Sequence, residues 1–161
     1  MMSRKRRTLD GEAVTSLILE VFRFNGRLLV AGDRLVSELG LTSARWQVMG
    51  AIALSSQPEP VARLARSMGL NRQGVQRIVN ELAAEGLVAF RPNPHHRRAK
   101  LVVLTDEGRR IYGAADKLQG PWANALARGL DPKVIAAATR IIEALRIRLE
   151  NELNVEPDER E

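Results

Sequence analysis

The chain has 161 residues, 45% of them apolar and 27% charged, which is the balance of one soluble globular domain rather than of a disordered chain. It has no cysteine and two histidines, which excludes disulfide scaffolds and thiol nucleophiles and leaves too few ligands for a multi-histidine metal site. The net charge is +6, with ten basic against four acidic residues from Val61 to Arg110 and six acidic against one basic from Glu150 onward. Such a clustered positive region indicates a nucleic-acid partner, although a merely basic surface is the alternative on charge alone.

The first twelve residues, 1–12, are predicted to form a disordered basic arm. No apolar signal-peptide core follows the basic start. Aliphatic runs such as Leu28 to Ala31 are far short of the roughly 20 apolar residues of a membrane helix. We therefore expect a cytoplasmic protein that does not cross a membrane.

A long helix is predicted over residues 13–39, because apolar side chains recur there at steps of three and four, with Gly40 at its C-terminus. An apolar stripe of about seven turns is too long for one small core, so part of it is expected to pack on another chain. A second helix, 44–54, is capped by Thr42 or Ser43, and residues 55–60 have the composition of a turn.

Two short helical patterns, 61–68 and 72–85, follow with the tight break Gly69-Leu70-Asn71 between them. Ala65 is small where two helices must cross closely, and Gly69 lies where the chain must turn, which together indicate a helix-turn-helix. The apolar period then changes to two, which predicts strands over 87–91 and 100–104 around the basic loop 92–99. A hairpin directly after a helix-turn-helix is a wing.

The C-terminal third is again helical by pattern. Thr105 can cap a helix that Gly120-Pro121 should kink or break and that stops near Gly129. Asp131-Pro132 then begins the last helix. Residues 154–161 are expected to be a frayed acidic tail. The last helix has a coiled-coil-like seam of Ile135, Ala138, Ile142, Leu145 and Leu149.

The helix over 72–85 carries the main candidate site. Apolar residues from Val75 to Leu82 occupy one side, while guanidinium and amide groups, which contact base edges in a major groove, occupy the other. No acid occurs from Val61 to Asn80, whereas an ordinary solvated face mixes both signs. The candidate base-reading residues are Arg72, Gln73, Gln76, Arg77 and Asn80.

The hairpin gives an independent signal, because arginine on a protruding tip suits a narrow minor groove. A mobile basic loop with only non-specific attraction is the alternative. Two adjacent histidines point apart and lack further ligands, so phosphate or solvent contact is favoured over a metal, and neither a metal nor a cofactor is predicted. The candidate DNA contacts here are Arg91, His95, His96, Arg97, Arg98 and Lys100.

Three stretches of the sequence resemble the MarR family of winged-helix transcriptional regulators: 41–48, 71–88 and 97–108, the last with Leu104-Thr105 and Gly108 as its most specific part. The resemblance covers roughly 13–153. It implies a homodimer held by intertwined N- and C-terminal helices, whose recognition helices and wings read a pseudo-palindromic operator. Arg77 matches the arginine common in the family's recognition helix, and Arg98 matches the wing-tip arginine that enters the minor groove.

The sequence departs from the family pattern at two places. His96 stands where the family usually has an aspartate that orients the wing arginine, and Gln73-Gly74-Val75-Gln76 replaces a Ser/Thr-rich helix start. The family's peroxide-sensing branch works through a cysteine, which this chain lacks.

The resemblance also implies that a small aromatic ligand binds between the dimer region and the DNA-binding lobe and weakens the grip on DNA. Buried aromatic residues at helical spacing are more often simply core. The candidate ligand-binding residues are Phe24, Arg27, Trp46 and Met49.

The sequence thus predicts a mostly α fold with a small β-wing. It is a winged helix-turn-helix over 41–105 with a helical dimerisation region over 13–40 and 106–153. The predicted function is a dimeric, double-stranded-DNA-binding transcriptional regulator. A sequence-indifferent architectural DNA binder and a winged-helix protein-interaction module remain as alternatives. An enzyme is disfavoured, because no nucleophile–base pair, glycine-rich phosphate loop or metal cluster is found in the sequence.

Overall fold

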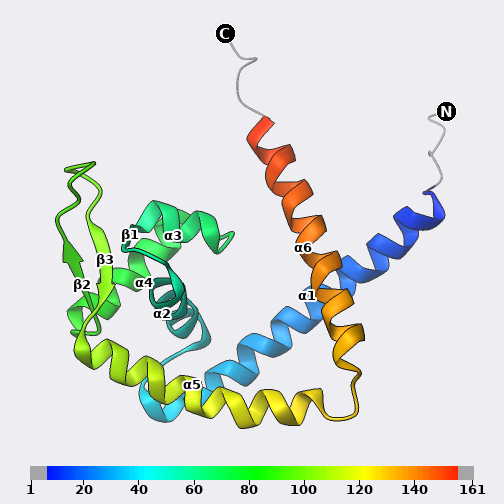
Figure 1. The fold of residues 1–161 in the computed structure, drawn as a ribbon, viewed down its shortest axis with the longest axis horizontal. Coiled ribbons are helices and arrows are strands. Elements are labelled where there is room, and N and C mark those ends of the chain that lie inside the picture. The colour runs from blue at the N-terminus through cyan, green and yellow to red at the C-terminus, as the bar shows by residue number, and fades with distance from the viewer. Residues whose placement is uncertain (1–6, 156–161) are drawn as a thin grey trace. The chain divides into compact units, whose positions relative to one another are not determined.

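The computed structural model describes residues 7–155, and the chain divides into two compact units, 1–120 and 121–161. The first unit holds α1 (Leu9–Val36), the 3-10 turn η1 (Ser37–Leu39), α2 (Ser43–Leu54), β1 (Glu59–Pro60), α3 (Val61–Ser67), α4 (Arg72–Ala84), β2 (Val88–Arg91) and β3 (Leu101–Leu104). Helix α5 (Asp106–Ala127) crosses the boundary, and the second unit contains its end and α6 (Pro132–Val155) (Figure 1). This confirms the predicted fold class: helices dominate, with one small sheet.

Helix α1 begins at Leu9 rather than at Ala13, so the predicted disordered arm was too long within the described residues. Thr8 caps the helix, its hydroxyl accepting a hydrogen bond from the backbone N–H of Gly11 at 3.1 Å, and Asp10 and Glu12 lie in the first turn at the positive end of the helix dipole. The regular helix also ends earlier than predicted, at Val36, before η1 and a left-handed Gly40. Positions 1–6 of the predicted arm lie outside the described residues.

The sheet has three antiparallel strands in the order β1–β3–β2. Its two long strands form the predicted wing hairpin, with Val88 opposite Leu104 and Arg91 opposite Leu101. The expectation of a plain turn over 55–60 was wrong at its end, because Glu59 and Pro60 pair with Val102 and Leu101 as β1. Proline is tolerated there because β1 is an edge strand.

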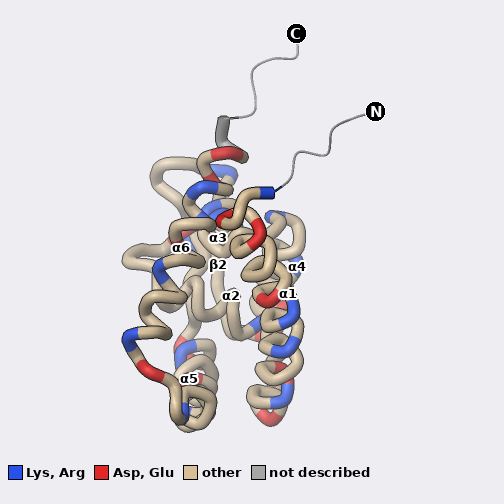
Figure 2. The backbone as a smooth tube through the Cα atoms, turned by 90° about the vertical axis from the view of Figure 1, so that its right-hand side faces the viewer, with Lys and Arg blue, Asp and Glu red and all other residues tan. Residues whose placement is uncertain are grey.

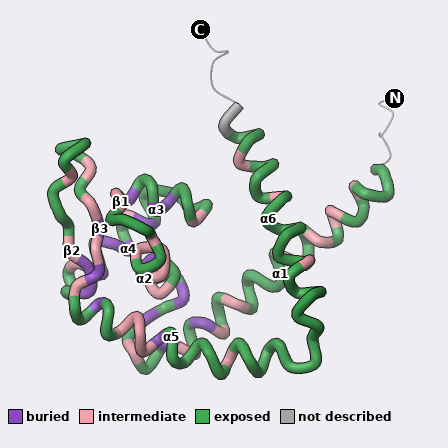
Figure 3. Tube along the Cα trace, viewed as in Figure 1, coloured by how far each residue is buried: buried purple, intermediate pink, exposed green. Residues whose placement is uncertain are grey.

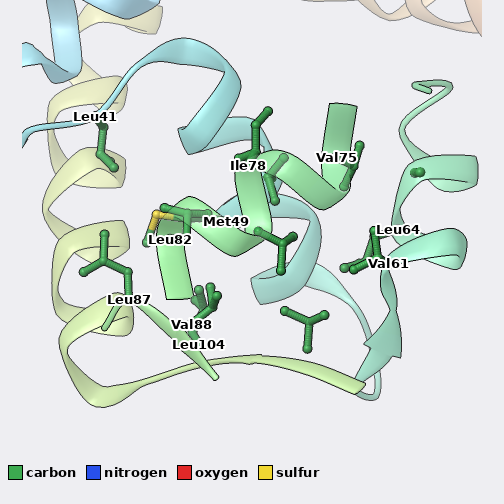
Figure 4. Close-up of a cluster of buried hydrophobic side chains, with 14 of the residues drawn as sticks. Leu41, Met49, Val61, Leu64, Val75, Ile78, Leu82, Leu87, Val88 and Leu104 are labelled. Carbon is green, nitrogen blue, oxygen red and sulfur yellow. The ribbon is translucent and has the colours of Figure 1, made fainter. Parts of the chain in front are cut away.

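One apolar core joins α2, α3, α4 and the sheet within the first unit (Figure 4). The side of α4 predicted to be apolar is buried: Val75, Val79 and Leu82 are at most 1% exposed. Gly69 and Gly86 adopt positive φ angles of 64° and 74°, which let the chain turn sharply after α3 and after α4. The helix-turn-helix therefore stands on a packed base that leaves the opposite side of α4 free.

Helix α5 is continuous through Pro121, so of the predicted kink or break at Gly120-Pro121 the break does not occur. Helix α6 extends to Val155, two residues into the predicted frayed tail, and the rest of that tail lies outside the described residues. Taken as a single chain, α6 exposes most of its length (Figure 3), including Ile135, Ile142 and Leu149 of the predicted seam. No helix within residues 7–155 is both long and apolar enough to cross a lipid bilayer.

Candidate nucleic-acid interface

The N-terminus of α4 is fixed by Asn71. Its side-chain oxygen accepts hydrogen bonds from the backbone N–H groups of Gln73 at 2.8 Å and Gly74 at 3.4 Å. A β-carbon at Gly74 would meet no atom within 4 Å, so the glycine leaves an open approach to the backbone at the start of the helix. The first turn of α4 is therefore both held by its cap and exposed to solvent. A helix end that binds a polyanion needs both properties.

Every base-reading candidate lies on the outer side of α4. Arg72, Gln73, Arg77 and Asn80 are exposed, and Gln76 is half-buried. The Nε2 of Gln76 donates to the Oδ1 of Asn80 at 2.9 Å. The five side chains line one shallow hollow along the helix, and the structure thus brings the predicted set together.

The same hollow includes an acidic residue, Glu81, that was not among the candidates. Its carboxylate lies 3.2 Å from the Nη1 of Arg77, one helical turn away. The signal was available in the sequence, because Arg and Glu four residues apart on a helix are neighbours. The stretch without acidic residues ends at residue 80, so Glu81 lies just outside the segment on which the charge argument was based.

The wing tip is organised by Asn93. Its side-chain nitrogen donates to the carbonyl of Ala99 at 2.9 Å, and its side-chain oxygen accepts from the N–H of His95 at 3.0 Å. Asn93 is half-buried, whereas His95, His96, Arg97 and Arg98 are exposed. Two tight turns complete the tip, with the N–H of His96 donating to the Asn93 carbonyl at 3.3 Å and the carbonyl of His96 accepting from the N–H of Ala99 at 3.0 Å. The loop geometry is thus held by Asn93. This asparagine lies three residues before His96, and it is His96 that stands where the family usually has an aspartate.

A groove of about 270 Å³ joins α4 to the wing. Arg72 and Gln76 line it from α4, and Arg98 and Lys100 line it from the wing. The aromatic ring of Phe90, 37% exposed on β2, contributes an apolar wall. None of the described residues that line this groove is acidic.

A second hollow lies against the wing. It is lined by Arg91, Arg97 and Lys100 with Phe90 and Asn93, so Lys100 faces both hollows. The two histidines line neither hollow and are exposed. In the sequence, Phe90 is only part of the alternating pattern that predicts a strand. That pattern does not predict that Phe90 lines the two hollows.

The charge of this surface contrasts with that of α1, which carries both acidic and basic residues (Figure 2). Within the described residues, no group of three or more His, Asp and Glu side chains could hold a metal ion. What the interface offers chemically is a set of cationic and amide donors around an apolar wall. Such a set can bind phosphates and base edges.

The four candidate ligand-binding residues lie in different environments. Met49 is fully buried in the core, and Trp46 packs half-buried against that core. Phe24 is 58% exposed on α1, and Arg27 is exposed one turn later. The four therefore stay a prediction.

The chain matches known proteins over most of its length. A family model described as MarR family matches residues 39–99. Uncharacterized protein Rv2011c of Mycobacterium tuberculosis is 34% identical over 141 residues, which cover 88% of this chain and 97% of the relative. Transcriptional activatory protein BadR of Rhodopseudomonas palustris is 29% identical over 120 residues, which cover 70% of this chain and 69% of BadR.

Solved structures agree with the fold. Sco5413, a MarR family transcriptional regulator from Streptomyces coelicolor, matches with a TM-score of 0.72 and 25% identity over 86% of this chain and 96% of that one. A mutant MarR from E. coli in complex with operator DNA matches at 0.73, with 21% identity over 86% and 99% of the two chains. CouR from Rhodococcus jostii RHA1 bound to p-coumaroyl-CoA matches at 0.72, with 23% identity over 80% and 90%.

The helix-turn-helix with its basic wing, the family model that covers residues 39–99 and the relatives that match 86–88% of the chain agree with one another. The chain belongs to the MarR family of winged-helix transcriptional regulators.

Proposed function

We propose that the protein is a dimeric regulator that binds double-stranded DNA at a pseudo-palindromic operator. In each subunit, the outer side of α4 enters a major groove, and the wing tip reaches into the adjacent minor groove. The observation that carries this proposal is the shared α4–wing groove, where Arg72, Gln76, Arg98 and Lys100 line one continuous, acid-free surface. The operator complex of the E. coli MarR mutant, which has the same fold, supports it.

The roles of the side chains follow from their chemistry. Lysine and arginine neutralise phosphates and supply affinity that falls as salt rises. Arginine, glutamine and asparagine on α4 discriminate among bases, and each good bidentate contact is worth about 1–3 kcal/mol. Arginine at the wing tip favours the narrow, electronegative minor groove of A·T-rich flanks.

The test is a selection of bound duplexes from a random pool with the full-length protein. Two inverted half-sites about 10–10.5 bp apart, centre to centre, are expected for a dimer that reads one face of the duplex. Arg98→Ala should keep the half-site sequence and lose the preference for A·T-rich flanks. A pool that stays random while duplex DNA binds tightly indicates the architectural alternative. Absence of binding even at low salt indicates the protein-interaction alternative.

We also propose that a small aromatic ligand regulates DNA binding through Phe24, Arg27, Trp46 and Met49. The complex of CouR with p-coumaroyl-CoA, a relative in fold, supports the idea. A ligand acts only if it binds one arrangement of the lobes more tightly than another. Thermal-shift screening with aromatic acids, followed by DNA-binding titrations with each hit, tests this. Hits that stabilise the protein without weakening DNA binding contradict it.

A further inference from the structure

Glu81 places a negative charge on the surface that α4 presents to DNA in the proposed function. It lines the same hollow as Arg72, Gln73 and Gln76, and 45% of its side chain is exposed. A carboxylate at a DNA-binding surface repels the phosphate backbone. Its position therefore needs a reason in the chemistry of the groups beside it.

The three arginines that line the two hollows beside α4 are in different electrostatic situations. Arg77 forms an ion pair with Glu81 at 3.2 Å. Arg72 and Arg98 line the α4–wing groove, and neither has a carboxylate oxygen of a described residue within 4.0 Å. Their full positive charges are therefore available to phosphates, whereas the charge of Arg77 is balanced within the protein.

The ion pair leaves Arg77 able to recognise a base. A guanidinium has five N–H donors in a planar fork, and the contact with Glu81 is made through Nη1 alone. The remaining donors can reach the two acceptors on the major-groove edge of guanine. The neighbouring pair, Gln76 to Asn80 at 2.9 Å, has the same four-residue spacing along the helix and orients an amide in the same way.

From this arrangement we infer that Glu81 is a positioning residue that holds Arg77 as a reader of base edges and keeps it from acting as a phosphate clamp. Arg77 then supplies sequence preference, whereas Arg72 and Arg98 supply salt-dependent affinity. This inference rests on the proposed function and names the residue that governs its specificity.

The test compares Glu81→Gln with the wild type in anisotropy titrations between about 50 and 200 mM salt. One duplex carries the selected operator, and the other is a scrambled duplex of equal length. In E81Q the freed Arg77 gains a phosphate contact, so binding to the scrambled duplex tightens. The slope of log K against log salt steepens by about one per subunit. The ratio of operator to scrambled affinity falls about fivefold or more, which is the lower end of what a bidentate base contact supplies.

Glu20→Gln is the matched control, because Glu20 pairs with Arg23 on α1 at 3.3 Å and its loss changes the charge equally. It should leave the affinity ratio and the salt slope unchanged. In an Arg77→Ala background, E81Q should lower the ratio no further, since Glu81 acts through Arg77.

Two results overturn the inference while the proposed function stands. In the first, E81Q has the same operator-to-scrambled affinity ratio and the same salt slope as the wild type. In the second, E81Q lowers the affinity ratio equally in the presence of Arg77 and in the Arg77→Ala background. A wild type that binds both duplexes equally overturns the proposed function, and the inference with it.

Discussion

Among single residues, those at the junction between the wing and α5 are tightly constrained. The hydroxyl of Thr105 donates to the carbonyl of Gly86 at 2.6 Å and accepts from the N–H of Gly108 at 3.0 Å. The N–H of Thr105 donates to the carbonyl of Leu87 at 3.1 Å. These bonds tie the end of the wing to the end of α4, so that the wing and the recognition helix keep one geometry. They give a physical reason for the Thr105 and Gly108 spacing seen in the sequence.

Gly108 should be intolerant of any side chain. A β-carbon there would overlap the carbonyl oxygen of Leu87, which is backbone and cannot rotate away. Gly108→Ala is expected to lower the free energy of unfolding by about 2–4 kcal/mol, measured by urea denaturation at one fixed protein concentration.

Gly113→Ala is the control for this substitution, since Gly113 lies in the same helix with no atom within 4 Å of a β-carbon. It should raise stability by about 0.5–1 kcal/mol. Equal effects of the two substitutions would contradict the assignment of Gly108 to a close backbone approach.

At this scale the sequence predicts which side of α4 is buried and which is exposed, because helical periodicity alone decides it. The spacing of four residues marks Arg77 and Glu81 as neighbours, but which nitrogen of the guanidinium meets the carboxylate depends on side-chain rotamers. The sequence also misses Asn93, whose two hydrogen bonds close a loop, and Phe90, whose role depends on how the wing lies against α3 and α4.

Among the elements, α5 contains an interior proline. Pro121 has no N–H to donate to the carbonyl of Lys117, and its ring crowds that carbonyl. The helix nevertheless continues to Ala127. The boundary between the two compact units falls at this point, between Gly120 and Pro121.

Pro121→Ala should strengthen α5 locally. Alanine restores one hydrogen bond and removes the clash, and the expected gain is up to about 3 kcal/mol. Hydrogen exchange should show slower exchange of the amides from residue 117 to residue 125. Pro132→Ala is the control, because Pro132 is the first residue of α6 and follows the capping Asp131, so a change below about 0.5 kcal/mol is expected. Unchanged hydrogen exchange around position 121 would contradict the proposal that Pro121 locally destabilises α5.

The elements were predictable to different degrees for a physical reason. Long helices follow from local periodicity and caps, and their types and approximate extents could be predicted. Strand β1 consists of two residues and exists only through its pairing with β3, about 40 positions later in the chain. Such a non-local partner leaves no mark on the local pattern.

In the whole molecule, the buried core lies mostly in the DNA-binding lobe, with Val36 and Ala115 added from α1 and α5. Helix α6, by contrast, presents apolar side chains that the single chain leaves uncovered. Ile135, Ile142 and Leu149 are 41%, 45% and 58% exposed and recur every seven residues. A seam of this kind is typical of helices that pack on another helix. Phe22 and Phe24 on α1 are similarly uncovered. A second copy of the chain, as in the proposed function, would remove these surfaces from water.

Ile142→Glu tests whether a dimer depends on the α6 seam. A charged side chain at the centre of an apolar helix interface costs several kcal/mol if it stays buried, so the dimer should dissociate at micromolar concentration. Sedimentation velocity measures the change in mass, and circular dichroism verifies that the helices remain; Ile142→Ala is the milder variant if they do not.

Binding to a duplex with two half-sites should weaken far more than binding to one half-site, because only the dimer engages both at once. Arg140→Glu, at an exposed position on the opposite side of α6, also introduces a glutamate and should leave the mass unaltered. An I142E protein that sediments as the wild type and keeps its preference for paired half-sites would place the subunit contact elsewhere.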